Sequence, residues 1–173
     1  MPKIIENLPE RLAEEARRQI EESGYAAMTI RSVAKGCGVG VGTVYNYYPS
    51  KEALVATFML ADWKVCVDCI QACANDAQEA EAVLRTMYEK LRLFMEQYDP
   101  IFRDESASTS YTGSTSKYHG FLRNQLAEPI RKFCADAFTA QFIAESMLTW
   151  TVAGKPFDDI FAVVSKLFWH IVK

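Results

Sequence analysis

The sequence lacks the features that indicate an enzyme. It contains only two histidines, His119 and His170, and no pair of acidic residues in an arrangement suited to acid–base catalysis. The glycines between residues 36 and 42 are not followed by the Lys-Ser/Thr pair that ends a nucleotide-binding loop. We therefore expect no catalytic residue, no bound metal ion and no cofactor.

Long hydrophobic runs and a basic composition are also missing. No stretch reaches the roughly 18 apolar residues that a membrane span requires, and the first residues, MPKIIENLPERL, lack the apolar core of a signal peptide. These absences predict a soluble, cytoplasmic protein without membrane partners. The five cysteines form no evident disulfide framework and are expected to be free thiols. A net charge of -3 excludes a uniformly basic nucleic-acid coat but leaves a local basic patch open.

No segment alternates polar and apolar residues as a strand does, whereas almost every segment has the helical period, so the predicted fold class is all-α. The pattern predicts two domains: a three-helix head over residues 1–50 and a helical bundle over residues 51–173. The polar run at residues 104–116 is predicted to be a mobile loop. The predicted helices, in chain order, cover residues 9–23, 29 to the glycines at 36–40, 41–47, 51–75, 79–97, 118–137, 139–152 and 157–172.

The most informative segment is TIRSVAKGCGVGVGTVYNYYPSK, residues 29–51, which we call the corner. It predicts two short helices joined by a glycine-rich turn, which is the layout of a helix-turn-helix. Its only charged residues are Arg31, Lys35 and Lys51, so the corner carries +3 within a chain of -3, and the rest carries -6. The corner is therefore the expected DNA-binding surface.

Each candidate contact in the corner has a physical reason. Gly42 permits close approach to the groove, Thr43 offers a hydroxyl and a methyl group, and two tyrosines reach toward the DNA backbone. The alternative is that the tyrosines only pack and that the glycines form an ordinary turn; Tyr48, beside Pro49, is expected to be a core residue. The candidate DNA-binding residues are Thr29, Arg31, Val41, Gly42, Thr43, Tyr45, Tyr47 and Lys51.

The corner and its flanks resemble the DNA-binding region of TetR-type transcriptional regulators. The resemblance runs from Ile20 to Leu54 and is carried by Gly24-Tyr25, Thr29-Ile30, Ala34, Gly38-Val39, Gly42-Thr43-Val44-Tyr45, Tyr47-Tyr48 and Lys51-Glu52. It implies a homodimer that binds double-stranded DNA at a palindromic operator. It also implies that the C-terminal helices bind a small-molecule effector and form the dimer interface.

Two departures from the family pattern bear on specificity. Gly40 stands where the family often has a capping serine, and Val41 stands where a polar or basic residue is common. The third helix contains no Arg or Lys, so bidentate reading of guanine from it is not expected. Specificity is then predicted to rest on Thr43, Val41, Arg31 and DNA shape, and to be modest.

The second half of the chain supplies candidates for the effector site and the dimer interface. Aromatic residues suggest an apolar effector site, for which the ligand-binding candidates are Phe94, Tyr98, Phe102, Tyr118 and His119. Each of these aromatics has an ordinary core role as its alternative. The last two helices carry more apolar side chains than one small bundle usually hides, which predicts that the homodimer forms through them; closing the monomer core is the alternative.

Cys66, Cys69 and Cys73 share one face of the fourth predicted helix. Packing is the favoured interpretation, because three ligands spread over two turns do not easily reach one tetrahedral ion. Metal or redox sensing is the alternative, and the sequence does not decide between the two.

Two hypotheses for the whole chain follow. The first is a ligand-responsive regulator, most simply a repressor released from its operator by the effector. The second is a TetR-like co-regulator that binds a partner protein instead of DNA, which the uncharged Gly-Val-Gly-Val-Gly turn suggests. The effector and the operator cannot be named from the sequence.

Overall fold

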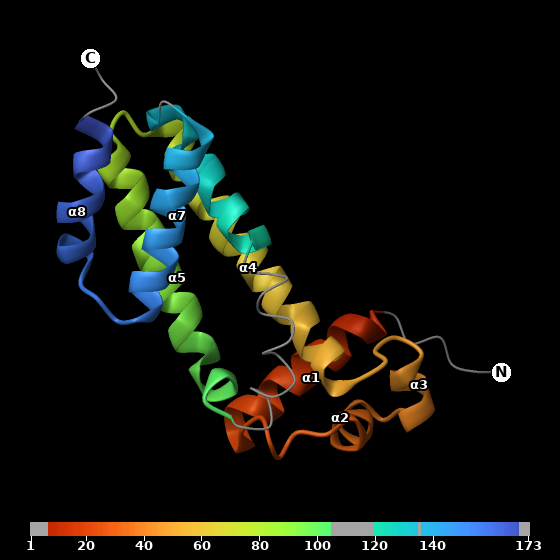
Figure 1. Ribbon diagram of the computed structural model, residues 1–173. Coiled ribbons are helices and arrows are strands. Elements are labelled where there is room, and N and C mark those ends of the chain that lie inside the picture. The colour runs from red at the N-terminus through yellow and green to blue at the C-terminus, as the bar shows by residue number, and fades with distance from the viewer. Residues whose placement is uncertain (1–6, 105–119, 135, 170–173) are drawn as a thin grey trace. The chain divides into compact units, whose positions relative to one another are not determined.

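The structure, a computed structural model, describes residues 7–104, 120–134 and 136–169 and is helical in every regular element of these ranges, as the sequence predicted (Figure 1). Residues 120–130 are also helical. The named elements are α1 (Leu8–Ser23), α2 (Ile30–Cys37), α3 (Val41–Tyr45), α4 (Lys51–Asp76), α5 (Ala80–Phe102), the 3₁₀ turn η1 (Arg131–Phe133), α7 (Ala137–Val152) and α8 (Phe157–Trp169).

The chain divides into two compact units. Unit 1 comprises residues 1–62 and 98–112, and unit 2 comprises residues 63–97 and 113–173. Unit 1 thus holds α1, α2 and α3 together with the beginning of α4 and the end of α5. The helices α4 and α5 each pass from one unit into the other.

The three N-terminal helices form as their sequence patterns predict. The inner face of α1 buries Leu12, Ala16 and Ile20, and Gly24 ends the helix with a φ of 84°, which a residue without Cβ adopts readily. Thr29 caps α2 by accepting a hydrogen bond from the Ser32 backbone amide. These local signals set the ends of α1 and α2, while α2 packs against α1 and α3 packs against α2.

Two helix boundaries in unit 1 differ from the predictions. The glycine Gly36 was expected to stop α2 but lies inside it, and Gly38, with a φ of 69°, is the residue that ends it. At Gly36, a Cβ atom would lie 2.2 Å from the Glu15 carboxylate on α1, so the glycine leaves room for that side chain. The third helix ends at Tyr45, two residues earlier than predicted.

The prediction that the fifth helix ends before Pro100 was wrong. In the structure α5 continues to Phe102 with Pro100 inside it, although proline lacks the amide that would donate to the preceding turn. On either side of Pro100, Tyr98 and Ile101 are each only 2% exposed within the chain. Burial of these two side chains therefore favours the helical path despite the missing hydrogen bond.

Unit 2 is a helical bundle around one hydrophobic core. The core includes Ile70 of α4, Leu84 and Met87 of α5, and Ile143 and Met147 of α7, all fully buried. The α7 helix starts one turn after η1, with Asp136 capping it through a hydrogen bond from the Thr139 amide. It is joined to α8 by a short turn at residues 153–156, so the two helices pack side by side (Figure 1).

Candidate DNA-binding surface

Gly38 forms the turn of the corner. Its backbone amide reaches the carbonyls of Ala34 and Lys35, and the Val39 amide donates to the Ala34 carbonyl at 2.9 Å. These bonds satisfy carbonyls that the end of α2 would otherwise leave without a partner. The turn thus directs the chain from α2 into α3 at a defined angle.

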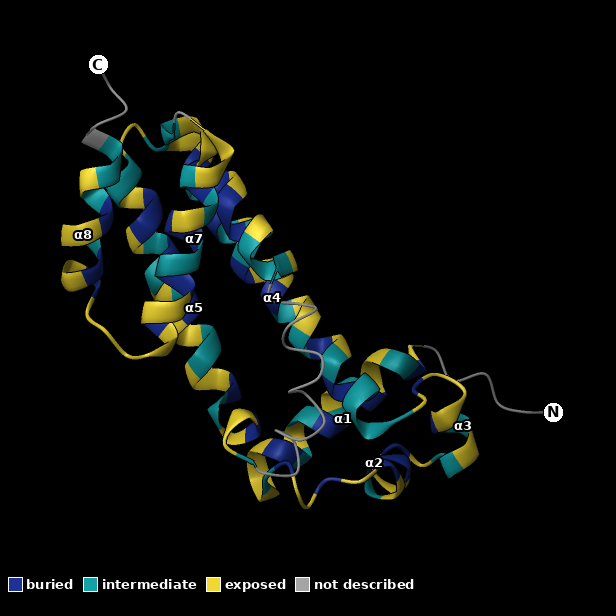
Figure 2. Cartoon of the chain, viewed as in Figure 1, coloured by how far each residue is buried: buried dark blue, intermediate teal, exposed yellow. Residues whose placement is uncertain are grey.

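The side chain of Val44 anchors α3 in unit 1 and is fully buried. At the start of α3, Gly40 has an extended backbone and no side-chain cap, as expected from the missing serine. The helix has only five residues. Besides Val44, Val41 and Thr43 are partly buried, and Gly42 and Tyr45 are exposed. Figure 2 shows exposed positions on α3 and on one side of α2.

The structure separates four neighbouring tyrosines into two kinds. Tyr25 and Tyr48 are buried, and the Tyr48 hydroxyl donates to the Pro9 carbonyl at 3.1 Å, which agrees with the predicted core role of Tyr48. In contrast, Tyr45 is 52% exposed and Tyr47 is 49% exposed. The two exposed tyrosines have no core role and are available to a partner at this surface.

Gly42 lies beside these tyrosines in the first turn of α3. A Cβ atom built at this position meets no atom within 4 Å, and its φ is not positive. Neither packing nor backbone conformation in the chain therefore requires a glycine here. Thr43 and Val41, which flank Gly42, are half-buried.

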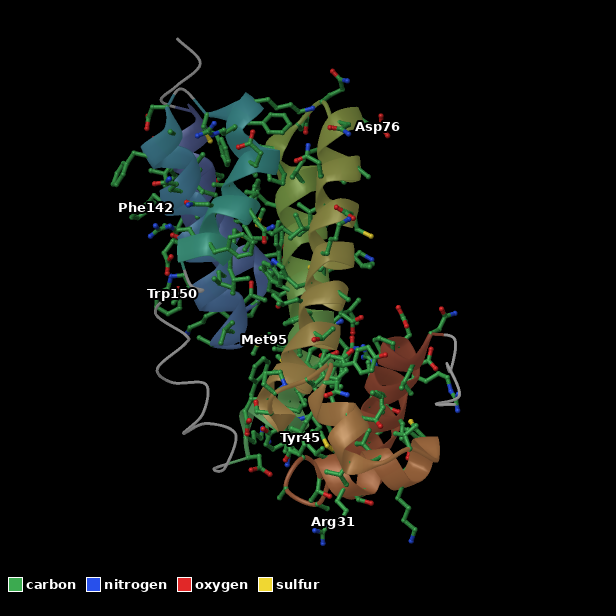
Figure 3. All side chains as sticks on the ribbon, turned by 90° about the vertical axis from the view of Figure 1, so that its right-hand side faces the viewer. Arg31, Tyr45, Asp76, Met95, Phe142 and Trp150 are labelled. Atoms are coloured by element: carbon green, nitrogen blue, oxygen red, sulfur yellow. The ribbon has the colours of Figure 1, made fainter. Side chains whose placement is uncertain are left out.

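The charged side chains of α2 point outward. Arg31 and Lys35 are exposed and lie four residues apart on one helix face, and neither forms an ion pair within the described part of the chain. Figure 3 shows the Arg31 side chain projecting from α2. Lys35 was not among the sequence candidates, although the i, i+4 spacing from Arg31 was a usable signal. Together they form a small basic stripe beside α3.

Two other sequence candidates already have partners within unit 1. Thr29 is exposed, but its hydroxyl is part of the α2 capping box, donating to the Ser32 Oγ at 3.1 Å. The Lys51 ammonium donates to the Tyr25 carbonyl and lies 3.8 Å from the centre of the Tyr25 ring. Burial lowers the pKa of Lys51. Both residues hold the corner in place, and their contacts to DNA remain predictions.

The candidate effector-site residues are divided between the units. Phe94 packs edge-to-face against Trp63 in unit 2, with ring centroids 5.4 Å apart. In unit 1, Tyr98 is buried with its hydroxyl donating to Asp62, and Phe102 is 41% exposed beside it. Tyr118, His119 and most of the predicted loop lie outside the described residues. The ligand role of these five residues remains a prediction.

One polar partner in unit 2 had no sequence signal. The Trp63 indole donates to the Gln125 side-chain oxygen at 2.7 Å. A glutamine on a helix is ordinarily a surface residue, and only the packing of the helical segment 120–130 against α4 reveals this contact.

The three cysteines of α4 have different surroundings. Cys66 is buried, and burial raises the pKa of its thiol to about 11. Cys73 accepts a hydrogen bond from the Thr86 hydroxyl at 3.3 Å. Within the described residues, no group of three or more metal-binding side chains is found. A thiol held protonated by burial is a poor metal ligand and a slow nucleophile.

The last two helices split their apolar residues between a core face and an exposed face. Ile143, Met147 and Val164 belong to the core of unit 2. On the outside, α7 and α8 border a groove of about 350 Å³, and Figure 3 shows Phe142 and Trp150 projecting from α7. The groove is lined by Phe142, Ser146, Trp150, Lys155, Asp159, Ile160, Val163 and Val164.

The fold and the corner define a helix-turn-helix protein with a second helical unit, and the helix-turn-helix region is similar to that of known proteins. Residues 12–57 match the family described as bacterial regulatory proteins, tetR family. The HTH-type transcriptional regulator UidR of Escherichia coli K12 is 33% identical over 52 residues, as is UidR of Shigella flexneri. The aligned part covers 30% of this chain and 26% of UidR, so the chain spans about a quarter of the length of these curated relatives.

Solved structures extend the likeness of the fold to nearly the whole chain. The fatty acid degradation regulator FadR from Bacillus halodurans is 20% identical with a TM-score of 0.59, covering 93% of this chain and 92% of FadR. A transcriptional regulator from Cytophaga hutchinsonii is 16% identical with a TM-score of 0.62, covering 95% and 98%. The family match covers the helix-turn-helix region at residues 12–57, and the compared structures share the fold of nearly the whole chain. No helix in the described residues is long and apolar enough to cross a membrane.

Proposed function

We propose that the chain is a ligand-responsive transcriptional repressor that binds a palindromic operator as a homodimer and is released by a small effector. In this proposal residues 1–50 bind DNA, and residues 51–173 bind the effector and form the dimer. The observation that carries it is the α3 surface, where two half-exposed tyrosines follow a glycine that the chain's own packing does not require.

The glycine argument supports close contact with an external surface. A side chain at Gly42 would point into open space, so the protein itself would tolerate one. In a major groove, a side chain at this position would hold the start of α3 away from the base edges. Close approach of a rigid partner to the α3 backbone therefore explains why residue 42 has no side chain.

The surroundings of α3 fit the two kinds of contact that DNA binding needs. The hydroxyls of Tyr45 and Tyr47 can donate to phosphates on either side of a groove, and the basic stripe of Arg31 and Lys35 adds charge attraction. Thr43 and Val41 are left to touch bases through a hydroxyl and methyl groups. Because α3 presents no Arg or Lys, these contacts favour modest sequence discrimination.

The exposed face of α7 and α8 supports dimerisation through these helices. Phe142 is 51% exposed, Trp150 is 48% exposed and Val163 is 64% exposed along the α7–α8 groove. Large apolar side chains gathered on one face of a soluble helical bundle are typical of an interface. A two-fold pair of these faces would cover them and present two α3 helices to successive major grooves, about 34–36 Å apart.

The effector site is proposed for unit 2 on narrower grounds. Phe94 and Trp63 form an aromatic pair, and the Gln125 amide bonded to Trp63 supplies a polar group beside it. Effector binding that moves α4 would change the separation of the two α3 helices in the dimer, because α4 follows directly after the corner.

The substitution Gly42→Ala tests DNA binding most directly. A duplex selected by the wild-type protein from a random pool would be titrated by fluorescence anisotropy, and we expect the affinity to fall about 10-fold or more while the melting temperature stays unchanged. The matched control is Gly120→Ala in unit 2, where a Cβ atom has only ordinary contacts. Equal affinity of the Gly42 variant and the wild type would refute the proposed groove contact.

The second candidate function is a co-regulator that binds a partner protein, favoured by the absence of charge between Gly36 and Gly42. Selection of a duplex from the random pool distinguishes the co-regulator from the repressor. A co-regulator would enrich no duplex from the pool, whereas a DNA-binding repressor would enrich a two-fold symmetric site.

A further inference from the structure

Three side chains that are far apart in sequence meet inside unit 1. The Arg17 Nη1 of α1 donates to the Asp62 Oδ2 of α4 at 2.8 Å. The Tyr98 hydroxyl of α5 donates to the same carboxylate oxygen at 2.6 Å, and the Arg17 Nη1 lies 3.4 Å from that hydroxyl. One carboxylate therefore ties α1 and α5 to α4 at a single point.

The surroundings of these three residues fix their geometry. The Arg17 guanidinium lies 4.7 Å from the centre of the Phe58 ring, and the Phe58 ring stacks on Tyr98 with centroids 6.3 Å apart. Burial, followed by the hydrogen bond to Asp62, raises the pKa of Tyr98, so the phenol remains a donor at neutral pH. The side chains of Arg17 and Asp62 are each 29% exposed, so water reaches the ion pair.

The position of this cluster in the chain is its most informative property. Asp62 is the last residue of the first stretch of unit 1, and Tyr98 is the first residue of its second stretch. These are the two points at which α4 and α5 leave unit 1. Beyond Tyr98, α5 contains Pro100 and so lacks one of its own helical hydrogen bonds. The end of α5 therefore depends on tertiary contacts for its place.

We propose that Arg17, Asp62 and Tyr98 form a releasable latch that holds the end of α5 in unit 1, and that opening the latch lowers the affinity of the corner for DNA. The link to DNA rests on the proposed function, whereas the latch itself does not. A closed latch fixes α1, which packs against α2, relative to α4, which begins just after α3. A partly exposed ion pair is weak enough to be opened by a modest coupling energy from an effector.

The latch is tested first without DNA, by hydrogen exchange measured with mass spectrometry. Tyr98→Phe removes only the hydroxyl and keeps the ring stacked on Phe58. We expect amides of residues 98–103 to exchange at least about 5-fold faster in this variant, because the end of α5 opens more often. Tyr88→Phe is the matched control, since it removes the same atom from α5 in unit 2. Unchanged exchange at residues 98–103 in Tyr98→Phe would overturn the latch.

The link to DNA is tested by combining variants. Tyr98→Phe and Arg17→Met are each expected to weaken binding to the selected duplex about 5-fold or more, and the double variant is expected to be no weaker than Arg17→Met alone. Circular dichroism at the assay temperature checks that every variant is folded. Multiplicative losses in the double variant, or full affinity in both single variants, would show that the three residues do not act together on DNA binding.

The two arms separate the latch from the proposed function. If the wild-type protein selects no duplex, the proposed function fails, and the exchange experiment still decides whether the latch holds α5. If the duplex is bound and exchange at residues 98–103 is unchanged, the latch fails and the proposed function stands.

Discussion

Around the α2–α3 corner the exposed aromatic side chains are tyrosines, whereas on α7 they are phenylalanines and a tryptophan. The hydroxyls of Tyr45 and Tyr47 suit a hydrated, charged partner such as a phosphate backbone. The rings of Phe142 and Trp150 suit a partner that excludes water, such as a second copy of the same face. The difference gives one chain two chemically distinct exposed surfaces, one for each of the partners proposed above.

The likeness to known proteins divides in the same way. The family match is confined to residues 12–57, while the fold extends over more than nine-tenths of the chain at 20% identity or less in the structures compared. A surface that fits a rigid duplex, as proposed for the corner, restricts the identity of each residue that touches it. A core requires only apolar side chains of suitable volume, so many sequences satisfy it.

The largest effect is expected at the α7–α8 face. Replacing both Phe142 and Trp150 with glutamate should raise the dimer dissociation constant by more than about 100-fold, because burying each aromatic contributes about 1.5–3 kcal/mol and charges there would be desolvated. Sedimentation velocity over a concentration series measures this. Phe121→Glu is the control, since Phe121 is 51% exposed but does not line the groove. A dimer that survives the double substitution would place the interface elsewhere.

The tyrosine comparison comes next. Tyr45→Phe combined with Tyr47→Phe should lower the affinity for the selected duplex about 10- to 100-fold, because two hydrogen bonds to phosphate are lost and each contributes about 0.5–1.5 kcal/mol net. The melting temperature should not change. Tyr48→Phe should instead affect stability and not DNA affinity. The variant loses the hydrogen bond to the Pro9 carbonyl, so its free energy of unfolding should fall by about 1 kcal/mol. A stability loss in the first variant would mean that its tyrosines pack.

Acid should act on unit 1 through Glu15. The hydrogen bond from Arg18, followed by that from Gln19, holds the pKa of Glu15 at about 2, below the ordinary 4.5. A lowered pKa means that this carboxylate stabilises the folded state above pH 4.5 and that the contribution is lost as the pH falls toward 2. Glu15→Gln should therefore flatten the decrease in melting temperature between pH 4.5 and 2. An identical decrease in variant and wild type would contradict this.

Alkali should act on unit 2 through Cys66. Burial raises the pKa of this thiol from 9.0 to about 11, so the protonated thiol stabilises the folded state below pH 9, and the contribution is lost as the pH rises through 11. Cys66→Ala should have a smaller decrease in melting temperature from pH 9 to 11 than the wild type. An identical decrease in variant and wild type would show that Cys66 does not cause it.

The smallest expected effect concerns sequence discrimination. Because α3 has no Arg or Lys, single base-pair changes in the selected site should each alter the affinity by less than the roughly 1–3 kcal/mol typical of well-read positions. Anisotropy titrations with a panel of altered duplexes measure this. A long, guanine-dependent motif from the selection would show that side chains outside α3, such as Arg31, read bases directly.

Local patterns determined most of what could be read from the sequence. Thr29 before a helical period, Gly24 and Gly38 at positive φ and Ser50 before α4 specify their elements through hydrogen bonds and steric limits within a few residues. The buried role of Tyr48 followed from Pro49 beside it. The corner and its resemblance to TetR-type regulators rest on these short-range constraints, which is why the sequence alone indicated the helix-turn-helix.

Only the tertiary structure determined which residues of one type are buried and which partners their side chains contact. It buried Tyr98 with Asp62 and Arg17, carried α5 through Pro100, and turned Lys51 toward Tyr25. It also assigned Phe94 and Tyr98 to different units, although they are one helical turn apart. Each outcome depends on side chains that are distant in sequence and compete for the same space or the same hydrogen-bond partner. A short sequence segment gives no information about such contacts.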